Sequence, residues 1–169
     1  MFATWLRENK IAAVILTVLR LYVGYAWITA GFEKLTENFS AAGFLKGAVA
    51  NPVQSPEGGL AYGWFVSFLK HFAVPNVDIF NTLIPLGEFL VGFGLILGCL
   101  TTAAMFFGLV MNFSYMFAGT ISSNPMDVLL GVIILAAGFN AGRIGLDRWV
   151  IPFIRKTVFK NNRAVEQNG

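Results

Sequence analysis

The stretch IAAVILTVLRLYVGYAWITAGF, residues 11–32, decides the fold of this chain. A helix needs about 20 apolar residues to cross the ~30 Å hydrocarbon core of a bilayer, and this stretch meets that length with a single charge, Arg20. It is longer than the ~7–15-residue apolar run of a signal peptide, and no A-x-A cleavage site ends it. We therefore expect it to remain in the mature protein as a transmembrane helix.

Further apolar stretches with at most one charge each follow at residues 82–100, 101–119 and 126–142. Over all 169 residues the chain is 56% hydrophobic and 12% charged, whereas soluble domains carry about 25% charged residues. The sequence predicts an all-α membrane protein, in which four transmembrane helices form a bundle and residues 1–169 form a single membrane domain.

The distribution of charge predicts an orientation for this bundle. Basic residues gather near the N-terminus and in the tail of residues 143–169, whereas the loop of residues 33–81 carries both signs. Cytoplasmic segments of membrane proteins carry an excess of Lys and Arg, so both termini are expected in the cytoplasm and the loop outside. The tail is expected to contact anionic lipids rather than nucleic acid. Pro152 is expected to end any helix in the tail.

The outer loop is too long and too apolar to be a simple linker. Aromatic and aliphatic residues recur at helical spacing on both sides of the turn-rich segment 51–59. We predict two short amphipathic helices that lie on the outer membrane surface or cap the bundle.

Single copies of two residues limit the chemistry of the chain. Cys99 is the only cysteine and His71 the only histidine, which excludes an intrachain disulfide, a C-x-x-C redox centre, and bis-histidine haem or multi-histidine metal ligation within one chain. We expect no metal and no haem. Any redox chemistry would need another bound cofactor or a partner.

Ionisable residues within apolar stretches are the strongest site candidates, because a charge in hydrocarbon normally faces a partner or a wet cavity. With a rise of ~1.5 Å per residue, Arg20 lies about 13 Å, Asn112 about 16 Å and Glu88 about 21 Å above the inner edge of the core. A long guanidinium side chain can cover such a difference. An Arg20–Glu88 pair with Asn112 as third member is therefore predicted. The alternative is an ion pair that only holds the helices together.

Other residues of the same helices complete the candidate site. Trp27 and Tyr115 could hold a planar ligand between their rings, although aromatic residues near membrane interfaces are often only anchors. Lys34 would attract anions at the outer end of the first span. Asp127 fits a helix-entry residue at the positive end of a helix dipole, and it could also meet Lys34.

The layout resembles the DoxX family of small bacterial membrane proteins, and its DoxD-like branch in particular. The resemblance runs from about residue 15 to residue 152 and rests on a series of short motifs in order: Leu19-Arg20-Leu21 with Gly24, Gly31-Phe32-Glu33-Lys34, Ile84-Pro85-Leu86-Gly87-Glu88, Gly92-Phe93-Gly94-Leu95-Ile96-Leu97-Gly98, Met111-Asn112-Phe113, Ser123-Asn124-Pro125 and Asn140-Ala141-Gly142-Arg143-Ile144-Gly145-Leu146-Asp147.

This resemblance implies a four-helix bundle in a bacterial cell membrane and a small membrane subunit of a thiosulfate:quinone oxidoreductase, accompanied by a second subunit. We accordingly expect quinone as the cofactor, with catalytic roles for Arg20 and Glu88, quinone contacts from Trp27, Asn112 and Tyr115, and anion approach near Lys34 and Asp127. Membrane lipid and a further copy of the chain are other expected partners. The alternative is a non-enzymatic carrier, or a scaffold that anchors a soluble redox partner.

Overall fold

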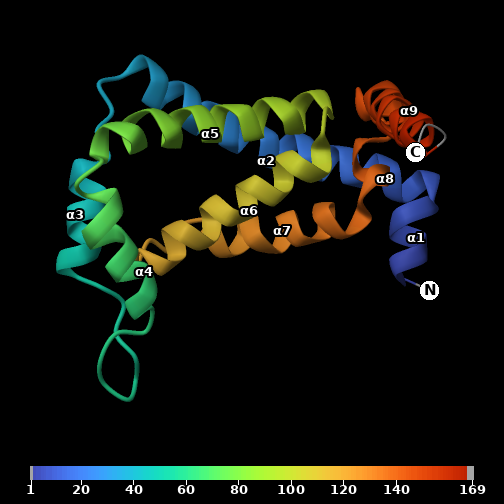
Figure 1. Ribbon diagram of the computed structural model, residues 1–169. Coiled ribbons are helices and arrows are strands. Elements are labelled where there is room, and N and C mark those ends of the chain that lie inside the picture. Colours follow the sequence, from blue (N-terminus) through green and yellow to red (C-terminus); the bar gives the residue numbers. More distant parts are fainter. Residues whose placement is uncertain (1, 167–169) are drawn as a thin grey trace.

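The computed structural model describes residues 2–166, and side chains up to residue 157. Over these residues the chain is helical, and an isolated bridge between Gln54 and Leu60 supplies the only β pairing. The elements follow one another in the order shown in Figure 1: α1 (Phe2–Glu8), α2 (Lys10–Thr36), α3 (Ala42–Ala50), α4 (Gly63–Phe68), the π-helical turn η1 (Leu69–Ala73), α5 (Val77–Leu97), α6 (Thr101–Phe117), α7 (Asn124–Ala137), α8 (Phe139–Gly142) and α9 (Asp147–Glu166).

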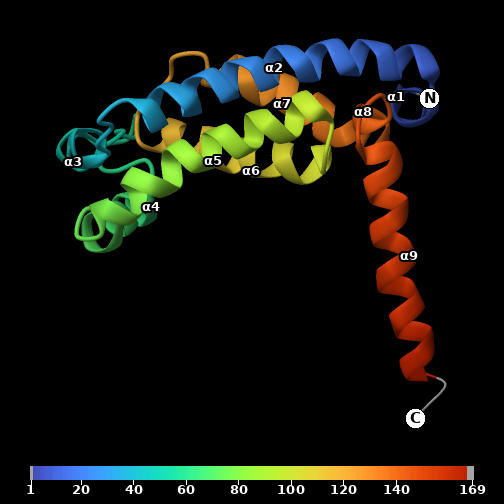
Figure 2. The same cartoon turned by 90° about the horizontal axis from the view of Figure 1, so that it is seen from above.

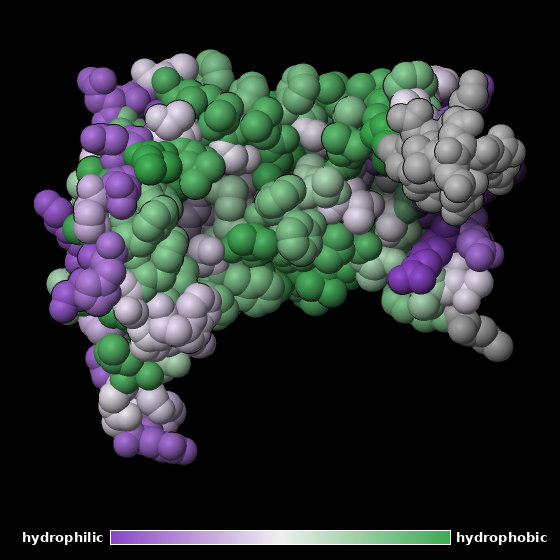
Figure 3. Space-filling view, viewed as in Figure 1, coloured by the Kyte–Doolittle hydropathy of each residue, from purple (hydrophilic) through white to green (hydrophobic). Residues whose placement is uncertain are grey.

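Four apolar helices form the body of the molecule, where the sequence predicts spans. Within residues 2–166, α2 and α5 are long and apolar enough to cross a membrane, whereas α6 and α7 are shorter apolar helices. Figure 3 shows hydrophobic residues over the middle of these helices and hydrophilic residues gathered at the two ends. The structure thus confirms an all-helical fold with membrane-capable helices, and the number of spans stays a prediction.

Helices α2 and α5 pack so closely that side chains are excluded from their contact. A Cβ atom on Gly92 would lie 2.6 Å from Cα and 2.7 Å from Cβ of Ile28, and one on Gly31 would lie 2.8 Å from Cα of Phe89. Small residues allow membrane helices to approach in this way. The contacts of residues 31 with 89 and 28 with 92 run in opposite directions, so the two helices are antiparallel.

Two apolar clusters divide the interior. The larger lies between α2, α5, α6 and α7 and contains Leu16, Val23, Trp27, Val91, Leu95, Met105, Leu109 and Ile134. The second lies where α3, α4 and η1 meet the ends of α5 and α6, and it contains Ala41, Leu45, Phe65, Leu69, Ala73 and Ala118. The predicted loop helices therefore exist, and they cap one end of the bundle (Figure 1).

The prediction that Pro152 ends helical structure is wrong, because α9 continues through it to Glu166. Proline removes the hydrogen bond to the carbonyl of Arg148, but it does not prevent the following residues from bonding to one another. Figure 2 shows α9 leaving the bundle at a steep angle to α2, at the end opposite α3 and α4.

The close contact of α2 and α5 predicts that a methyl group added at Gly92 destabilises the protein, whereas one added at a glycine outside this contact does not. Gly92→Ala should destabilise the protein by about 1–3 kcal/mol, because the backbone of α2 has to move away from the new Cβ. Thermal unfolding in a mild detergent measures the difference.

Gly47→Ala is the matched control. Gly47 lies inside α3, and a Cβ there would meet nothing within 4 Å, so the alanine should be neutral or stabilising by up to ~1 kcal/mol. Equal melting temperatures for the two variants would contradict the close packing at Gly92.

Candidate functional site

Arg20 is buried at the end of the bundle remote from α3 and α4, with 2% of its surface exposed. Its guanidinium donates hydrogen bonds to the carbonyls of Leu95, of Ile96 (3.2 Å) and of Ile144 (2.9 Å). The first two belong to the last turn of α5, where helix carbonyls lack partners within the helix and carry partial negative charge. Arg20 therefore ties α2 to the end of α5 and to the segment after α8.

Asp147 completes this arrangement from the other side of the turn between α5 and α6. Its carboxylate accepts hydrogen bonds from the backbone N–H groups of Leu100 (2.6 Å) and Thr101 (2.9 Å), which begin α6. Its own N–H donates to the carbonyl of Gly98 at 2.7 Å. We call Arg20, Asp147 and these backbone partners the Arg20 cluster, and it closes the α5–α6 turn.

The predicted Arg20–Glu88 pair does not form. Glu88 instead accepts a hydrogen bond from Lys34 Nζ at 2.7 Å and one from the hydroxyl of Tyr115 at 2.8 Å. Seven residues, or about 10 Å of α5, separate Glu88 from Leu95. The guanidinium of Arg20 donates to the nearer carbonyls of α5 and does not reach up to the carboxylate of Glu88.

Lys34, Glu88 and Tyr115 form a second polar cluster, the Glu88 cluster, near α3 and α4. Lys34–Glu88 is the ion pair found among the side chains of residues 2–157. The side chain of Lys34 is 30% exposed, whereas that of Glu88 is buried and the hydroxyl of Tyr115 lies beyond it. Three helices, α2, α5 and α6, thus place an ammonium, a carboxylate and a phenol in one line of hydrogen bonds.

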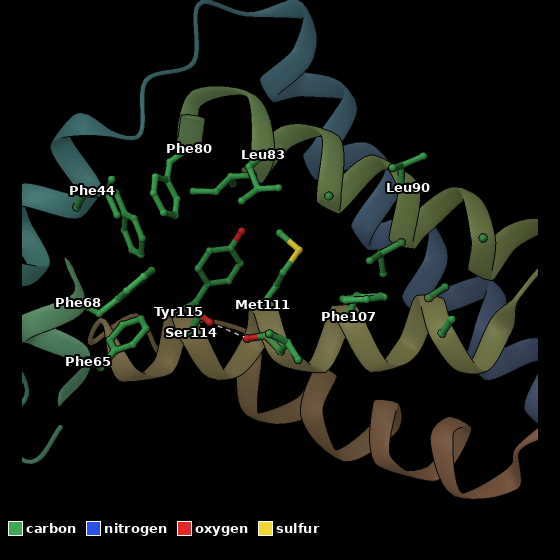
Figure 4. A pocket seen from close by; sticks show the side chains of 18 of the residues that line it. Phe44, Phe65, Phe68, Phe80, Leu83, Leu90, Phe107, Met111, Ser114 and Tyr115 are labelled. Atoms are coloured by element: carbon green, nitrogen blue, oxygen red, sulfur yellow. Dashed lines mark hydrogen bonds between the residues drawn. The ribbon is translucent and has the colours of Figure 1, made fainter. Parts of the chain in front are cut away.

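A groove of about 630 Å³ lies beside Tyr115, between α5 and α6. Figure 4 shows the ring of Tyr115 in the middle of it, with Phe44, Phe65, Phe68 and Phe80 around one end and Leu90 and Phe107 toward the other. Its lining is apolar except for Tyr115 and Ser114, and the hydroxyl of Ser114 donates to the carbonyl of Val110 at 2.8 Å. The hydroxyl of Tyr115 is therefore the polar group that connects the groove with Glu88.

Other predicted site residues lie apart from the groove. Trp27 is 6% exposed, belongs to the apolar core and faces Gly108, so the predicted sandwich of Trp27 and Tyr115 is absent. Asn112 is buried one turn before Tyr115, and its amide nitrogen has no hydrogen-bond partner among the described residues. It forms no hydrogen bond to Arg20 or Glu88.

Asp127 lies in the first turn of α7, where it accepts a hydrogen bond from the hydroxyl of Ser123 at 2.9 Å. This agrees with a helix-entry residue. The contact with Lys34 considered from the sequence is not formed, because the ammonium of Lys34 is bound to Glu88.

The aromatic end of the groove was not predicted from the sequence. Its residues come from α3, α4 and α5, and the helical spacing of Phe44 and Leu45 and of Phe65, Phe68 and Leu69 was a visible signal for buried faces. The spacing alone does not say against which helix these faces pack.

A comparison with models of protein families identifies the family of this chain. The model of the DoxX family matches residues 15–120. The chain belongs to the DoxX family. No curated protein and no solved structure shows a significant match.

The matched region contains most of α2 and all of α5 and α6, with Arg20, Lys34, Glu88 and Tyr115, and it ends before α7. This DoxX protein is therefore a membrane protein whose Glu88 cluster and groove lie wholly within the family domain. Ile144 and Asp147, which complete the Arg20 cluster, lie outside the matched residues.

The hydrogen bonds of the Arg20 cluster predict that Arg20 stabilises the folded protein. Arg20→Met should lower the free energy of unfolding by about 3 kcal/mol or more, because it leaves the carbonyls of Ile96 and Ile144 without a donor and takes one of two donors from the carbonyl of Leu95. Thermal unfolding in detergent, followed by circular dichroism, measures the loss.

Arg7→Met makes the same chemical change at an exposed site, where Arg7 donates one hydrogen bond to the carbonyl of Ala136 at 2.9 Å. The cost there should be about 1 kcal/mol or less. If Arg20→Met melts like the wild type, Arg20 does not hold the helices together.

Proposed function

We propose that this DoxX protein is the membrane subunit of a quinone-linked oxidoreductase, and that the quinone occupies the groove between α5 and α6. The observation that carries the proposal is the hydroxyl of Tyr115, bonded to the buried Glu88 and placed at an otherwise apolar groove. Ligand pockets commonly measure ~300–1,000 Å³ and combine an apolar lining with few polar groups, and the groove matches this description.

The shape of the groove suits a flat ring on a long apolar tail. The phenylalanines at one end offer ring faces and edges for stacking, and the stretch toward Leu90 and Phe107 offers aliphatic and aromatic surface for the tail. Because the groove lies between two apolar helices, a lipid-soluble substrate would enter it sideways from the bilayer.

Reduction of a quinone takes up two electrons and two protons, and each carbonyl oxygen becomes a hydroxyl. On binding of the quinone, the hydroxyl of Tyr115 would turn its one proton from Glu88 to a carbonyl oxygen and transfer it as that oxygen gains charge. This path would supply one of the two protons, and the second carbonyl oxygen would take its proton from water at the membrane surface. The ammonium of Lys34 would pass a proton to the carboxylate of Glu88, which would hand it on to Tyr115, and Lys34, the partly exposed member of the cluster, would take up a new proton from water. Arg20, first considered for this role, instead positions the helices, since both of its terminal nitrogens donate to backbone carbonyls.

The electrons would come from a partner subunit, as the DoxD-like resemblance implies. Two thiosulfate ions joined by a new S–S bond form tetrathionate and release two electrons, which balances the reduction of one quinone. Lys34 is partly exposed near the end of α2 and marks the side from which the anion would approach, with its charge balanced by Glu88.

We further propose that α2, α5, α6 and α7 all cross a bacterial cell membrane, with both termini in the cytoplasm. Helix α6 is about 26 Å long and α7 about 21 Å, slightly short of the hydrocarbon core. Helix α6 packs against α5, α7 packs against α2, and the two pack against each other; this packing and the basic residues of α1 and α9 support the arrangement.

The role of Tyr115 predicts the effect of removing one oxygen atom. Tyr115→Phe should lower quinone reduction by the purified complex about 100-fold or more, which is the usual contribution of a general acid, while the groove keeps its shape. Tyr25→Phe is the matched control, because Tyr25 is 67% exposed on α2 and should leave the rate unchanged.

Glu88→Gln should lower the rate in the same way, whereas Glu33→Gln on the exposed side of α2 should not. If quinone reduction survives both Tyr115→Phe and Glu88→Gln in folded protein, the proposed proton path is wrong. Uptake of a solute into proteoliposomes without redox change would favour a carrier instead.

Cys99 provides a direct probe of binding, because it lines the groove. An added quinone should slow the labelling of Cys99 by a lipophilic maleimide about 10-fold. When quinone occupies about 90% of the grooves, only ~10% of the Cys99 thiols remain open to the reagent. Mass spectrometry of the intact protein follows the labelling.

The control carries Cys99→Ser together with Val132→Cys. Val132 is 48% exposed on α7 and does not line the groove, so quinone should not change its labelling rate. Equal labelling of Cys99 with and without quinone would show that the groove is not the binding site.

A further inference from the structure

A second crevice lies at the opposite end of the bundle, beyond the Arg20 cluster. Its volume is about 410 Å³, and it lies between the beginning of α6, the end of α7 and the first turns of α9. The lining residues are apolar apart from Thr102: Leu100, Thr102, Ala103, Phe106, Phe107, Leu135 and Ile151. The wall from α6 faces the region that lipid would occupy around the bundle.

Two arginines flank the residue that α9 contributes to this crevice. Arg148 precedes Ile151 by three residues and Arg155 follows it by four, so all three share one side of the helix. Both arginines are exposed, and neither forms an ion pair with a side chain of residues 2–157. The crevice therefore has an apolar floor with two exposed guanidinium groups on the same side of α9 as Ile151.

The direction of α9 places these guanidinium groups at a membrane surface. Figure 2 shows α9 at a steep angle to α2, so α9 would lie along the bilayer surface if α2 crosses the bilayer. Trp149 and Phe153 are 62% and 71% exposed, and the guanidinium of Arg148 lies 5.4 Å from the ring centre of Trp149. Exposed aromatic residues beside basic ones are typical of helices that lie in the interface.

We propose that the crevice and the Arg148–Arg155 side of α9 form a binding site for one anionic phospholipid. An acyl chain would fill the crevice between α6 and α7, and the phosphate would lie against the two guanidinium groups, which suit phosphate geometry. Charge complementarity decides for an anionic lipid, since a zwitterionic headgroup brings an additional cation to the same arginines. The site shares a wall of α6, Leu100, Ala103 and Phe107, with the groove beside Tyr115, but it does not depend on the redox proposal.

The position of Asp147 explains why such a lipid could affect the whole protein. Asp147 begins α9 and at the same time binds the first N–H groups of α6, one residue before Arg148. A lipid held by Arg148 and Arg155 would fix α9 against the bundle end that Arg20 and Asp147 close.

The experiment uses the full-length protein, delipidated in detergent, with lipid added back and counted by native mass spectrometry. Phosphatidylglycerol should bind at one copy per chain about 30-fold more tightly than phosphatidylcholine of the same chain length, which corresponds to two basic residues near an anionic headgroup. Arg148→Gln with Arg155→Gln should remove this preference. Thr102→Trp, which fills the crevice from α6 without touching the groove beside Tyr115, should weaken binding of both lipids.

Lys46→Gln with Lys70→Gln is the matched control, because it removes two exposed cations from α3 and η1 at the other end. It should leave the binding of phosphatidylglycerol unchanged. Equal binding of the two lipids, loss of preference in the control, or displacement of phosphatidylglycerol by millimolar inorganic phosphate alone would overturn the proposal. The melting temperature of each variant separates loss of the site from loss of the fold.

Discussion

The guanidinium of Arg20 is the interaction on which the rest of the structure depends. It is buried, and it bonds to carbonyls at the end of α5 and to the carbonyl of Ile144. A buried charge without partners would cost several kcal/mol, and so would buried helix-end carbonyls without donors. Each therefore needs the other, and their pairing sets where α2, α5 and the segment before α9 meet. Asp147 extends the arrangement by capping α6, so one end of the bundle is closed by a continuous network.

Helix α2 carries polar groups at two depths: Arg20 holds the helices together, and Lys34 belongs to the cluster beside the groove. Lys34 follows Arg20 by about 21 Å of helix, and it binds Glu88 in the middle of α5. Between them, the glycines of α2 and α5 bring the backbones into contact and leave no room for a ligand. The open space is found instead on the other side of α5, against α6, where Tyr115 carries the polar cluster into the groove. The rigid α2–α5 pair would hold Glu88 in place while the α5–α6 side accepts a substrate.

Particular residues show how far sequence reasoning reached. The four apolar helices overlap the predicted stretches, since length and hydropathy are local properties of the chain, but α5 ends at Leu97 and α7 at Ala137, before the predicted ends at residues 100 and 142. Glu88, Lys34 and Tyr115 were singled out one by one, yet Glu88 was paired with Arg20. That error came from the assumption that the long side chain of Arg20 would span the difference in depth to Glu88. The carbonyls of Leu95 and Ile96 were nearer acceptors. Backbone acceptors carry no sequence signal, because every residue has one. Trp27 was assigned to the ligand on residue type alone, and the packing against Gly108 places it in the core.

The amino-acid sequence by itself determined the helical membrane character of this protein and the set of buried ionisable residues that need partners. These follow from hydrophobicity, spacing and the cost of charge in hydrocarbon, which act along the chain. Only the tertiary structure decided which partners they have. Hydrogen bonds form over a few ångströms, so the rotation and axial offset of one helix against another determine whether Glu88 meets Arg20 or Lys34. The same offsets bring α3 and α4 over the end of α5 and α6 and create the groove, which no single segment contains.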